Sequence, residues 1–307
     1  MSLKLTILGC HSATPRTFAH PTSQFLEMNN RCFLIDCGEG TQSQLRKFKI
    51  KFSKIKHIFI SHLHGDHFYG LVGLISTFSL LNRETELHVF APKGAEEIIR
   101  LQFKLSKSWI HFPLYFHDLT SKKSEKIYED KQVEVHTIPL DHRIYTNGFL
   151  FQEKLAERKI NMAAVLNEKD IEICDYQNLK NGKDFIRPDG TVISNKQLTF
   201  NPPPALKYAF CSDTAYFENI IPMIKSADLL YHESTFLEDK ADLAASTKHA
   251  TAKQAAEIAA KAQVKKLILG HYSSRYKNIE VFLEEAKPVF ENTVLAEEGK
   301  VFLLDNK

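Results

Sequence analysis

One short run of metal-binding side chains constrains this chain more than any other feature. Ser61-His62-Leu63-His64-Gly65-Asp66-His67 directly follows an apolar run at 57–60 that predicts a buried strand. Imidazole nitrogens and carboxylate oxygens are good ligands for zinc and similar divalent ions. His62 and His64 point the same way in an extended segment, and Gly65 lets the chain turn toward Asp66 and His67. The run therefore predicts ligands for two neighbouring metal ions. A solvated polar loop is the alternative interpretation, but such a loop rarely gathers four ligands at this spacing.

The composition is that of an ordinary globular protein, with 307 residues, 43% of them hydrophobic and 25% charged. No stretch approaches the roughly 18 apolar residues of a membrane span, and the N-terminus is too short and alternating for a signal peptide. We therefore expect a cytoplasmic protein with no membrane partner. Five cysteines without a CxxC motif predict reduced thiols. The net charge of +3 permits a nucleic-acid partner without arguing for one.

Apolar periodicity predicts a mixture of strand pairs and strand–helix units, and hence an α/β fold with two sheets. The predicted strands are 3–9, 24–28, 32–36, 55–61, 86–91, 131–139, 148–154, 207–211, 228–231, 265–270, 294–296 and 300–304. The predicted helices are 42–49, 68–81, 94–105, 251–262 and 279–290. Residues 155–204 are polar, weakly periodic and balanced in charge. We expect them to form an arm inserted into one domain of residues 1–307, with a solvated spacer as the alternative.

The four clustered ligands cannot saturate two metals, so further ligands should follow other strands. His142, Asp213 and His271 each come shortly after a predicted strand, where loops gather and sites form. A lone histidine there is more often structural, but together these residues complete two coordination spheres. The predicted groups are His62, His64 and His142 for one metal, Asp66, His67 and His271 for the other, and Asp213 as the bridge. Each ion keeps an open position for a shared water, as in catalytic zinc sites, and two ions about 3.5–4 Å apart can direct that water at a phosphoryl group.

These motifs carry a family resemblance. The HxHxDH spacing at 62–67, followed by His142, Asp213 and His271, resembles the metallo-β-lactamase superfamily, whose fold is a four-layer αβ/βα sandwich. The runs His232-Glu233-Ser234-Thr235, His249-Ala250-Thr251 and His271-Tyr272-Ser273-Ser274-Arg275-Tyr276 are more specific. With them, nearly the whole chain resembles ribonuclease Z, the endonuclease that removes 3′ trailers from precursor tRNA.

The resemblance implies a role for each site residue. The seven side chains above would be the metal ligands, and Asp66 would also accept a proton from the attacking water. His249 would protonate the leaving oxygen, and Glu233 would hold it in the required tautomer. Independently of the resemblance, Arg275, with Ser273 and Ser274, follows His271 and is expected to contact phosphate because guanidinium suits paired phosphate contacts, with an ordinary solvated arginine as the alternative. The resemblance also implies two Zn²⁺ per subunit, for which Mn²⁺ or Fe²⁺ are alternatives, and a homodimer in which the arm grips precursor tRNA.

Three functions are consistent with these residues. The first is a zinc-dependent endoribonuclease that leaves a 3′-hydroxyl on tRNA and a 5′-phosphate on the trailer. The second is a phosphodiesterase or other esterase of the same superfamily that acts on a small molecule, with the arm as a lid. The third is a non-catalytic RNA-binding protein with a vestigial metal site. The complete ligand set argues against the third.

Overall fold

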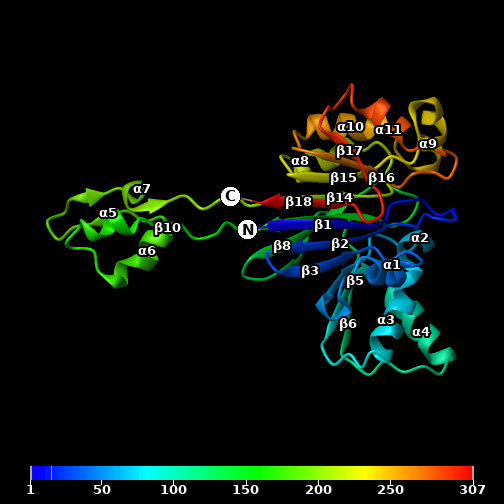
Figure 1. Cartoon of the computed structure of the whole chain (residues 1–307), viewed down its shortest axis with the longest axis horizontal. Coiled ribbons are helices and arrows are strands. Elements are labelled where there is room, and N and C mark those ends of the chain that lie inside the picture. The colour runs from blue at the N-terminus through cyan, green and yellow to red at the C-terminus, as the bar shows by residue number, and fades with distance from the viewer. Residues whose placement is uncertain (1, 15, 306–307) are drawn as a thin grey trace.

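The computed structural model describes residues 2–14 and 16–305, and in this part of the chain two seven-stranded sheets pack face to face. Helices cover the outer face of each sheet, so the body has four layers in the order αβ/βα (Figure 1). This is the predicted α/β class with two sheets. Among the described residues, no helix combines the length and the apolar character needed to span a bilayer.

The N-terminal sheet has the strand order β18-β1-β2-β3-β4-β5-β6. Its strands are β1 Ser2–Gly9, β2 Ser23–Met28, β3 Arg31–Ile35, β4 His57–Phe59, β5 Leu87–Pro92, β6 Leu114–Leu119 and β18 Val301–Asp305. Strands β3 to β6 pair in parallel, so their carboxyl ends lie along one edge of the sheet.

The C-terminal sheet has the order β17-β16-β15-β14-β9-β8-β7. Its strands are β7 Lys126–Glu129, β8 Val133–Pro139, β9 Asn147–Glu153, β14 Lys207–Cys211, β15 Leu229–Glu233, β16 Leu267–Gly270 and β17 Thr293–Leu295. Strands β14 to β17 pair in parallel, while β9 pairs antiparallel with β14. The carboxyl end of β9 therefore lies beside the start of β14, at the end of the sheet opposite to Cys211.

Helices pack on both outer faces (Figure 1). The helices on the N-terminal side are α1 Thr41–Lys47, α2 Gly65–Phe68, α3 Gly70–Leu80 and α4 Ala95–Leu105, with a 3₁₀ turn at Phe52–Lys54. Those on the C-terminal side are α8 Ile221–Ile224, α9 Ala241–Thr247, α10 Ala252–Lys261 and α11 Glu280–Ala286, with 3₁₀ turns at Glu218–Ile220 and Glu238–Lys240. Helix α10 begins with a capping box, in which Gln254 N donates to Thr251 Oγ1 over 3.1 Å.

The space between the sheets is filled by large aromatic side chains from both. Phe33 and Phe59 of the N-terminal sheet contact Phe151 of the C-terminal sheet with ring centroids 5.2 and 5.3 Å apart. Phe149 and Tyr208 are also fully buried there. This packing fixes one sheet against the other, and with it the loops at the carboxyl ends of their strands.

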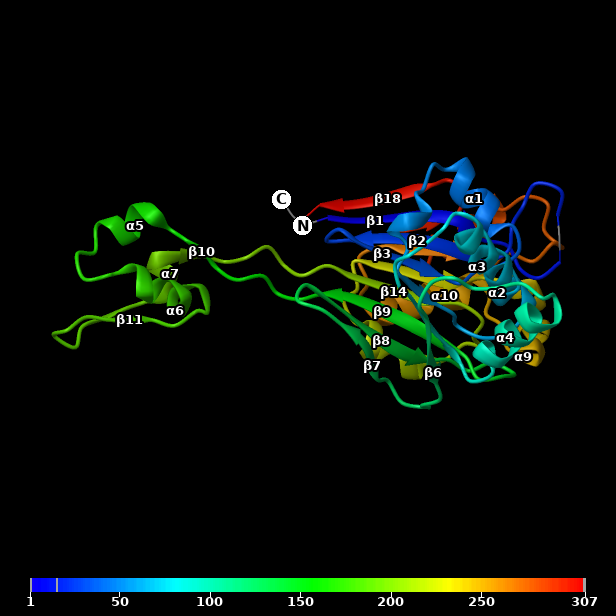
Figure 2. The same cartoon turned by 90° about the horizontal axis from the view of Figure 1, so that it is seen from below.

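Residues 155–204 extend away from the body and form a small module of their own (Figures 1 and 2). Its elements are β10 Lys159–Ile160, α5 Met162–Leu166, a 3₁₀ turn Ile173–Asp175, α6 Tyr176–Lys180, β11 Phe185–Ile186, β12 Val192–Ile193, α7 Asn195–Leu198 and β13 Thr199–Phe200. A core of Val165, Leu179, Ile193 and Leu198 holds it together. This segment therefore has more local structure than its weak periodicity predicted.

Several details of the body differ from the sequence predictions, which also did not include the short helices α8 and α9. Strands β6 and β7 were not predicted, because both are edge strands with mostly exposed or half-buried side chains and lack a clear alternation. The predicted helix 68–81 is divided at Tyr69 into α2 and α3. A Cβ on Gly70 would lie 2.1 Å from Gly38 O, so the start of α3 approaches the loop after β3 too closely for any other residue.

Candidate metal centre

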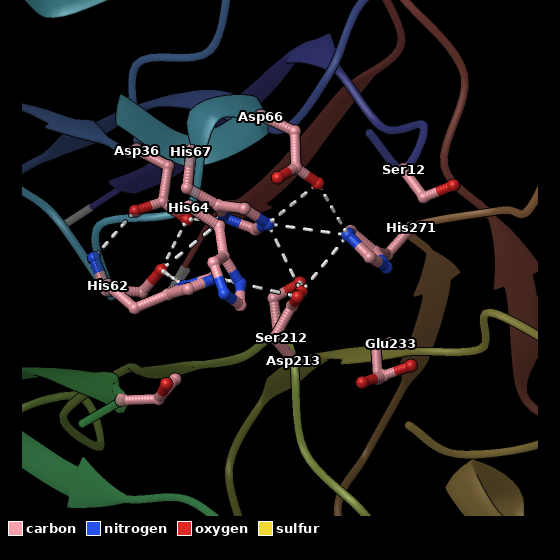
Figure 3. Close-up of polar contacts among 12 residues, drawn as sticks. Ser12, Asp36, His62, His64, Asp66, His67, Ser212, Asp213, Glu233 and His271 are labelled. Carbon is pink, nitrogen blue, oxygen red and sulfur yellow. Dashed lines mark hydrogen bonds and ion pairs between the residues drawn. The ribbon is translucent and has the colours of Figure 1, made fainter. Parts of the chain in front are cut away.

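The predicted metal ligands converge at the carboxyl ends of strands from both sheets. His62 and His64 follow β4, and Asp66 and His67 lie on α2. The other three ligands come from the loops after β8, β14 and β16, namely His142, Asp213 and His271. Residues separated by about two hundred positions in the sequence are thus brought within a few ångströms of one another (Figure 3).

The ligand atoms form two groups, each spanning less than 4.8 Å. In the first, His62 Nε2 lies 3.0 Å from His64 Nδ1, which lies 3.3 Å from His142 Nε2. In the second, His271 Nε2 lies 3.3 Å from His67 Nε2 and 3.2 Å from Asp66 Oδ2. These are the two groups that the sequence predicted.

The Asp213 carboxylate belongs to both groups. Its Oδ2 lies 3.5 Å from His62 Nε2 and 3.7 Å from His142 Nε2. Its Oδ1 lies 3.1 Å from both His67 Nε2 and His271 Nε2. Figure 3 shows this carboxylate between the two sets of histidines. One oxygen therefore faces each group, which is the arrangement expected of a bridging ligand.

These donor sets fit divalent cations. Ligands about 2.0–2.1 Å from a tetrahedral zinc ion lie about 3.3–3.4 Å from one another, close to the separations found here. Burial lowers the pKa of His62, His64 and His142, so their imidazoles are neutral at neutral pH and can bind a cation. Burial also lowers the pKa of His67, but Asp213, Asp66 and Asp36 outweigh it and raise the pKa well above the usual value. The same negative charge would favour a divalent cation at His67 Nε2.

The second ring nitrogen of four ligand histidines is held by a neighbour. His67 Nδ1 lies 2.6 Å from Asp36 Oδ2, and His62 Nδ1 lies 3.0 Å from Ser61 Oγ. His142 Nδ1 donates to the carbonyl of Lys248 over 2.9 Å, and His271 Nδ1 lies 2.8 Å from Thr235 Oγ1. Such contacts fix which nitrogen faces a metal.

Sequence reasoning assigned no role to Asp36, Thr235 or Lys248. Asp36 also accepts hydrogen bonds from Ser61 N and Ser61 Oγ, so it orients the loop that carries the first ligands. Thr235 lies in a motif used for the family resemblance, and that position was the available signal for it. Lys248 acts through its backbone carbonyl, which no side-chain pattern encodes.

Several site residues have left-handed backbone conformations. The φ angles are 55° at Asp36, 62° at Asp213 and 62° at His271, each at the first or second position after a strand. This region is uncommon for non-glycine residues, although aspartate and histidine are enriched in it. The sharp turn aims each side chain back across the strand ends toward the common centre.

His249 lies beside the second group and is oriented by Glu233. His249 Nδ1 lies 2.9 Å from Glu233 Oε1, and this carboxylate is fully buried. Glu233 also accepts hydrogen bonds from Thr214 N over 2.7 Å and from Ala250 N over 3.2 Å. Burial lowers the pKa of His249, but the Glu233 carboxylate outweighs this effect and raises the pKa to about 9. His249 is therefore held as an acid at neutral pH, with Nε2 as the nitrogen that can donate.

The centre opens into a cavity of about 950 Å³. Its lining includes Asp66, His249 and the predicted phosphate contacts Ser273, Ser274 and Arg275. The Arg275 side chain is exposed, so it is accessible to an anion entering the cavity. His232 is fully buried, and its Nδ1 donates a hydrogen bond to the carbonyl oxygen of Glu233 over 2.8 Å.

Comparison with known proteins identifies relatives over almost the entire length. The chain is 46% identical to a protein named ribonuclease Z from Bacteroides thetaiotaomicron, over 99% of this chain and 96% of that one. It is 47% identical to a ribonuclease Z from Cytophaga hutchinsonii, over 100% of this chain and 98% of that one. The chain belongs to the ribonuclease Z family. As a ribonuclease Z it is an endoribonuclease, a hydrolase, and its donor groups are compatible with a divalent metal site.

Solved structures agree with this assignment. The chain is similar to human tRNase Z, short form, with 26% identity, a TM-score of 0.70 and coverage of 97% of this chain and 98% of that one. The chain is also similar to the metallo-β-lactamase-fold protein YhfI from Bacillus subtilis, with 18% identity, a TM-score of 0.69 and coverage of 99% of this chain and 100% of that one, which supports the fold alone. Residues 3–170 also match a family model described as Anti-Pycsar protein Apyc1.

Proposed function

We propose that this ribonuclease Z removes the 3′ trailer of precursor tRNA, leaving a 3′-hydroxyl on the tRNA and a 5′-phosphate on the trailer. The names of its relatives, including a tRNase Z, support this substrate. The observation that carries the proposal is the pair of donor groups joined by Asp213 at the base of an open cavity. This geometry suits hydrolysis of a phosphodiester by two adjacent cations.

Two Zn²⁺ ions are the proposed cofactors, and Mn²⁺ or Fe²⁺ suit the same nitrogen and oxygen donors. His62, His64 and His142 would hold one ion, Asp66, His67 and His271 the other, and Asp213 both. When bound, the ions would make water a nucleophile at neutral pH and neutralise charge on the scissile phosphate.

Asp66 is the proposed proton acceptor for the attacking water. Burial raises the pKa of this carboxyl, but His67 and His271 outweigh burial and lower the pKa far below its usual value. Asp66 is thus ionised throughout the physiological range and lines the cavity beside the ligand histidines. A carboxylate so placed can accept or orient the proton of a nucleophilic water.

His249 is the proposed proton donor to the departing 3′ oxygen. Glu233 holds its Nδ1–H, which leaves Nε2–H to be transferred to the leaving group. Arg275, with Ser273 and Ser274, would contact the phosphate on the same side of the cavity, because guanidinium forms paired hydrogen bonds with phosphate oxygens. Each of these roles is independent of the identity of the metal.

We further propose that the chain is one domain with residues 155–204 as an inserted arm that binds the tRNA body. The arm leaves the body between β9 and β14, at the end of the sheet opposite to the metal centre (Figure 2). It is thus remote from the cavity of its own chain, which favours a homodimer in which it serves the partner's substrate. Protein reads folded RNA mainly through shape and phosphates, which suits a small module presented at a distance. We expect the enzyme to act in the cytoplasm.

The direct test incubates the purified protein with Zn²⁺ and a tRNA transcript carrying a 3′ extension, and maps the ends of the products at nucleotide resolution. We expect a single cut on the 3′ side of the acceptor stem, and no cut after chelation. Absence of cleavage near the discriminator base in the metal-loaded protein would contradict the proposal. Light scattering of the same sample measures the molar mass in solution, for which we expect twice the mass of one chain.

A further inference from the structure

A second cavity lies on the outer surface of the N-terminal half and is lined by cations that the metal centre does not use. It has a volume of about 640 Å³ and lies between the end of α1, the 3₁₀ turn Phe52–Lys54 and the end of α3. We name it the basic groove. Its lining residues are Arg46, Lys49, Ile50, Lys51, Phe52, Ser53, Phe78, Leu81, Asn82, Arg83, Glu84 and Thr85.

The charge of the basic groove is strongly one-sided. Residues 46–56 contain six lysines and arginines and no acidic residue, and Glu84 is the one carboxylate among the described lining residues. Arg46, Lys49 and Lys51 are exposed, and within residues 2–14 and 16–305 none of their side chains forms an ion pair or a hydrogen bond. Uncompensated cations around one cavity favour a polyanionic ligand.

Structural roles account for only part of this charge. Arg83 stabilises the fold, because its guanidinium donates hydrogen bonds to the carbonyls of Ile55, Thr85 and Glu86. The guanidinium carbon also lies 4.8 Å from the centroid of the Phe78 ring. Arg46 lies in the last turn of α1, where a cation stabilises the helix dipole. Lys49 and Lys51 lie beyond that helix, and in the described part of the chain their backbone groups form hydrogen bonds but their side chains do not.

The groove also offers apolar surface to a base. Phe52 is half-buried in the lining, and the Arg46 guanidinium lies 5.0 Å from its ring centroid. Leu81 is 49% exposed at the rim. A cationic groove with an aromatic floor is the arrangement that proteins use for single-stranded nucleic acid, because phosphates pair with the cations while bases stack on rings.

Two helices connect the groove to the metal centre. Glu39 and Gly40, which immediately precede α1, line the catalytic cavity, and so does Tyr69, which precedes α3. Both helices end at the groove. At 1.5 Å per residue, α1 spans about 10 Å and α3 about 16 Å, so the two cavities are a few nucleotides apart.

We infer that the basic groove binds the 3′ trailer of the precursor as a single strand. This inference rests on the proposed function, which places a paired acceptor stem on one side of the scissile phosphate and the unpaired trailer on the other. A stem cannot enter a cavity of this size, whereas one or two nucleotides of a single strand can. The groove would hold the trailer during the cut and release it afterwards.

The test uses the full-length K49Q/K51Q variant and two precursors that share one tRNA body but carry a trailer of about one or about fifteen nucleotides. We expect the variant to raise KM for the long trailer only, with kcat unchanged. The logarithm of the binding constant falls linearly with the logarithm of the salt concentration, and the loss of two phosphate contacts to a single strand makes this slope shallower by about 1.4. The KM of the variant therefore rises less with salt than that of the wild type, and the ratio of variant to wild-type KM falls about sevenfold between about 50 and 200 mM salt.

The matched control is K104Q/K107Q. Lys107 follows α4 in a left-handed conformation with φ 52°, just as Lys49 follows α1 with φ 58°, and neither control lysine lines a cavity described above. We expect this control to behave as the wild type with both precursors. Equal effects of K49Q/K51Q on both trailers, or no effect on either, would overturn the inference. A change of oligomeric state in light scattering would also overturn it, because the groove would then be an interface between copies of the chain.

A direct binding measurement separates this inference from the proposed function. If the wild type cleaves neither precursor, the proposed function fails. Single-strand binding by the basic groove is then tested separately, by measuring the fluorescence anisotropy of a labelled oligouridylate of about ten nucleotides as protein is added. Weaker binding by K49Q/K51Q than by the wild type and the control would support a single-strand site. Equal binding by all three proteins would overturn it.

Discussion

The metal centre and the arm are built in different ways: the centre from residues far apart in the sequence, the arm from residues that are close together. The centre is assembled from loops after β4, β8, β14 and β16, and five of its seven ligand residues are buried, while His64 and His142 are partly exposed. The arm is built from neighbouring residues, and its core consists of four side chains that pack only on one another and on nearby arm residues. The centre thus depends on both sheets and on the aromatic packing between them, whereas the arm depends on the body only for its two connections.

This difference would separate the chemistry from the proposed recognition of RNA by the arm. A change in the arm leaves the strand ends untouched, so the proposed recognition could vary while the candidate metal centre stays the same. A change in the core between the sheets displaces ligands from both sides at once. The following predictions, from the largest effect to the smallest, test that separation.

Removal of divalent metal should abolish cleavage of every substrate, with or without the arm. We expect EDTA treatment to reduce hydrolysis of both precursor tRNA and bis(p-nitrophenyl) phosphate to background, and added Zn²⁺ to restore both. Asp213→Asn should lower the bound metal measured by atomic absorption, because this residue contributes to both groups. Full activity in metal-free protein would contradict the dependence of cleavage on a divalent metal at the centre.

His249→Ala should reduce kcat on precursor tRNA by about 10²–10⁴-fold, the usual contribution of a general acid. KM should change little, because the predicted role is proton transfer to the leaving oxygen. Single-turnover kinetics at saturating enzyme measures this step directly. His136→Ala on β8, at a residue that does not line the cavity, is the control. Equal rates for H249A and the wild type would remove His249 from the mechanism.

Replacing residues 156–204 with a short glycine–serine link should affect only the large substrate. The link is feasible because Glu153 N already donates to the carbonyl of Leu206 over 2.9 Å, so the two connections begin side by side. We expect kcat/KM for precursor tRNA to fall roughly 10²-fold through the loss of phosphate contacts. Hydrolysis of bis(p-nitrophenyl) phosphate should change by less than about twofold, because distant sites act independently. Parallel loss of both activities would show that the arm supports the centre.

Glu233→Gln should shift the pH profile and reduce kcat by about 10–100-fold, as loss of a partner of a site histidine does. Glu233 raises the pKa of His249, so the acid form persists to higher pH in the wild type than in the variant. Because the acid form is lost as pH rises through that pKa, the alkaline limb of kcat should move to lower pH in E233Q. An alkaline limb at the same pH in both proteins would contradict the assignment.

The sequence predicted the centre better than the arm, for a physical reason. His62 to His67 are adjacent in sequence, and the other ligands follow strands, which apolar runs mark clearly. Asp36, Thr235 and the carbonyl of Lys248 were missed because their function is to hold a histidine ring, and only the fold brings them to it. The arm was underestimated because helices of four or five residues, such as α5 and α7, are too short to show periodicity.

The shared carboxylate of Asp213 has a consequence for how the enzyme fills with metal. Because its two oxygens face different groups, an ion at either position alters the charge and orientation that the other ion meets. Thermodynamic reciprocity then requires the first ion to change the affinity for the second by the same factor as the reverse. With the two ions of the proposed function, occupancy of the two positions would therefore be a linked equilibrium, and the amount of active enzyme would not follow the binding curve of a single independent site.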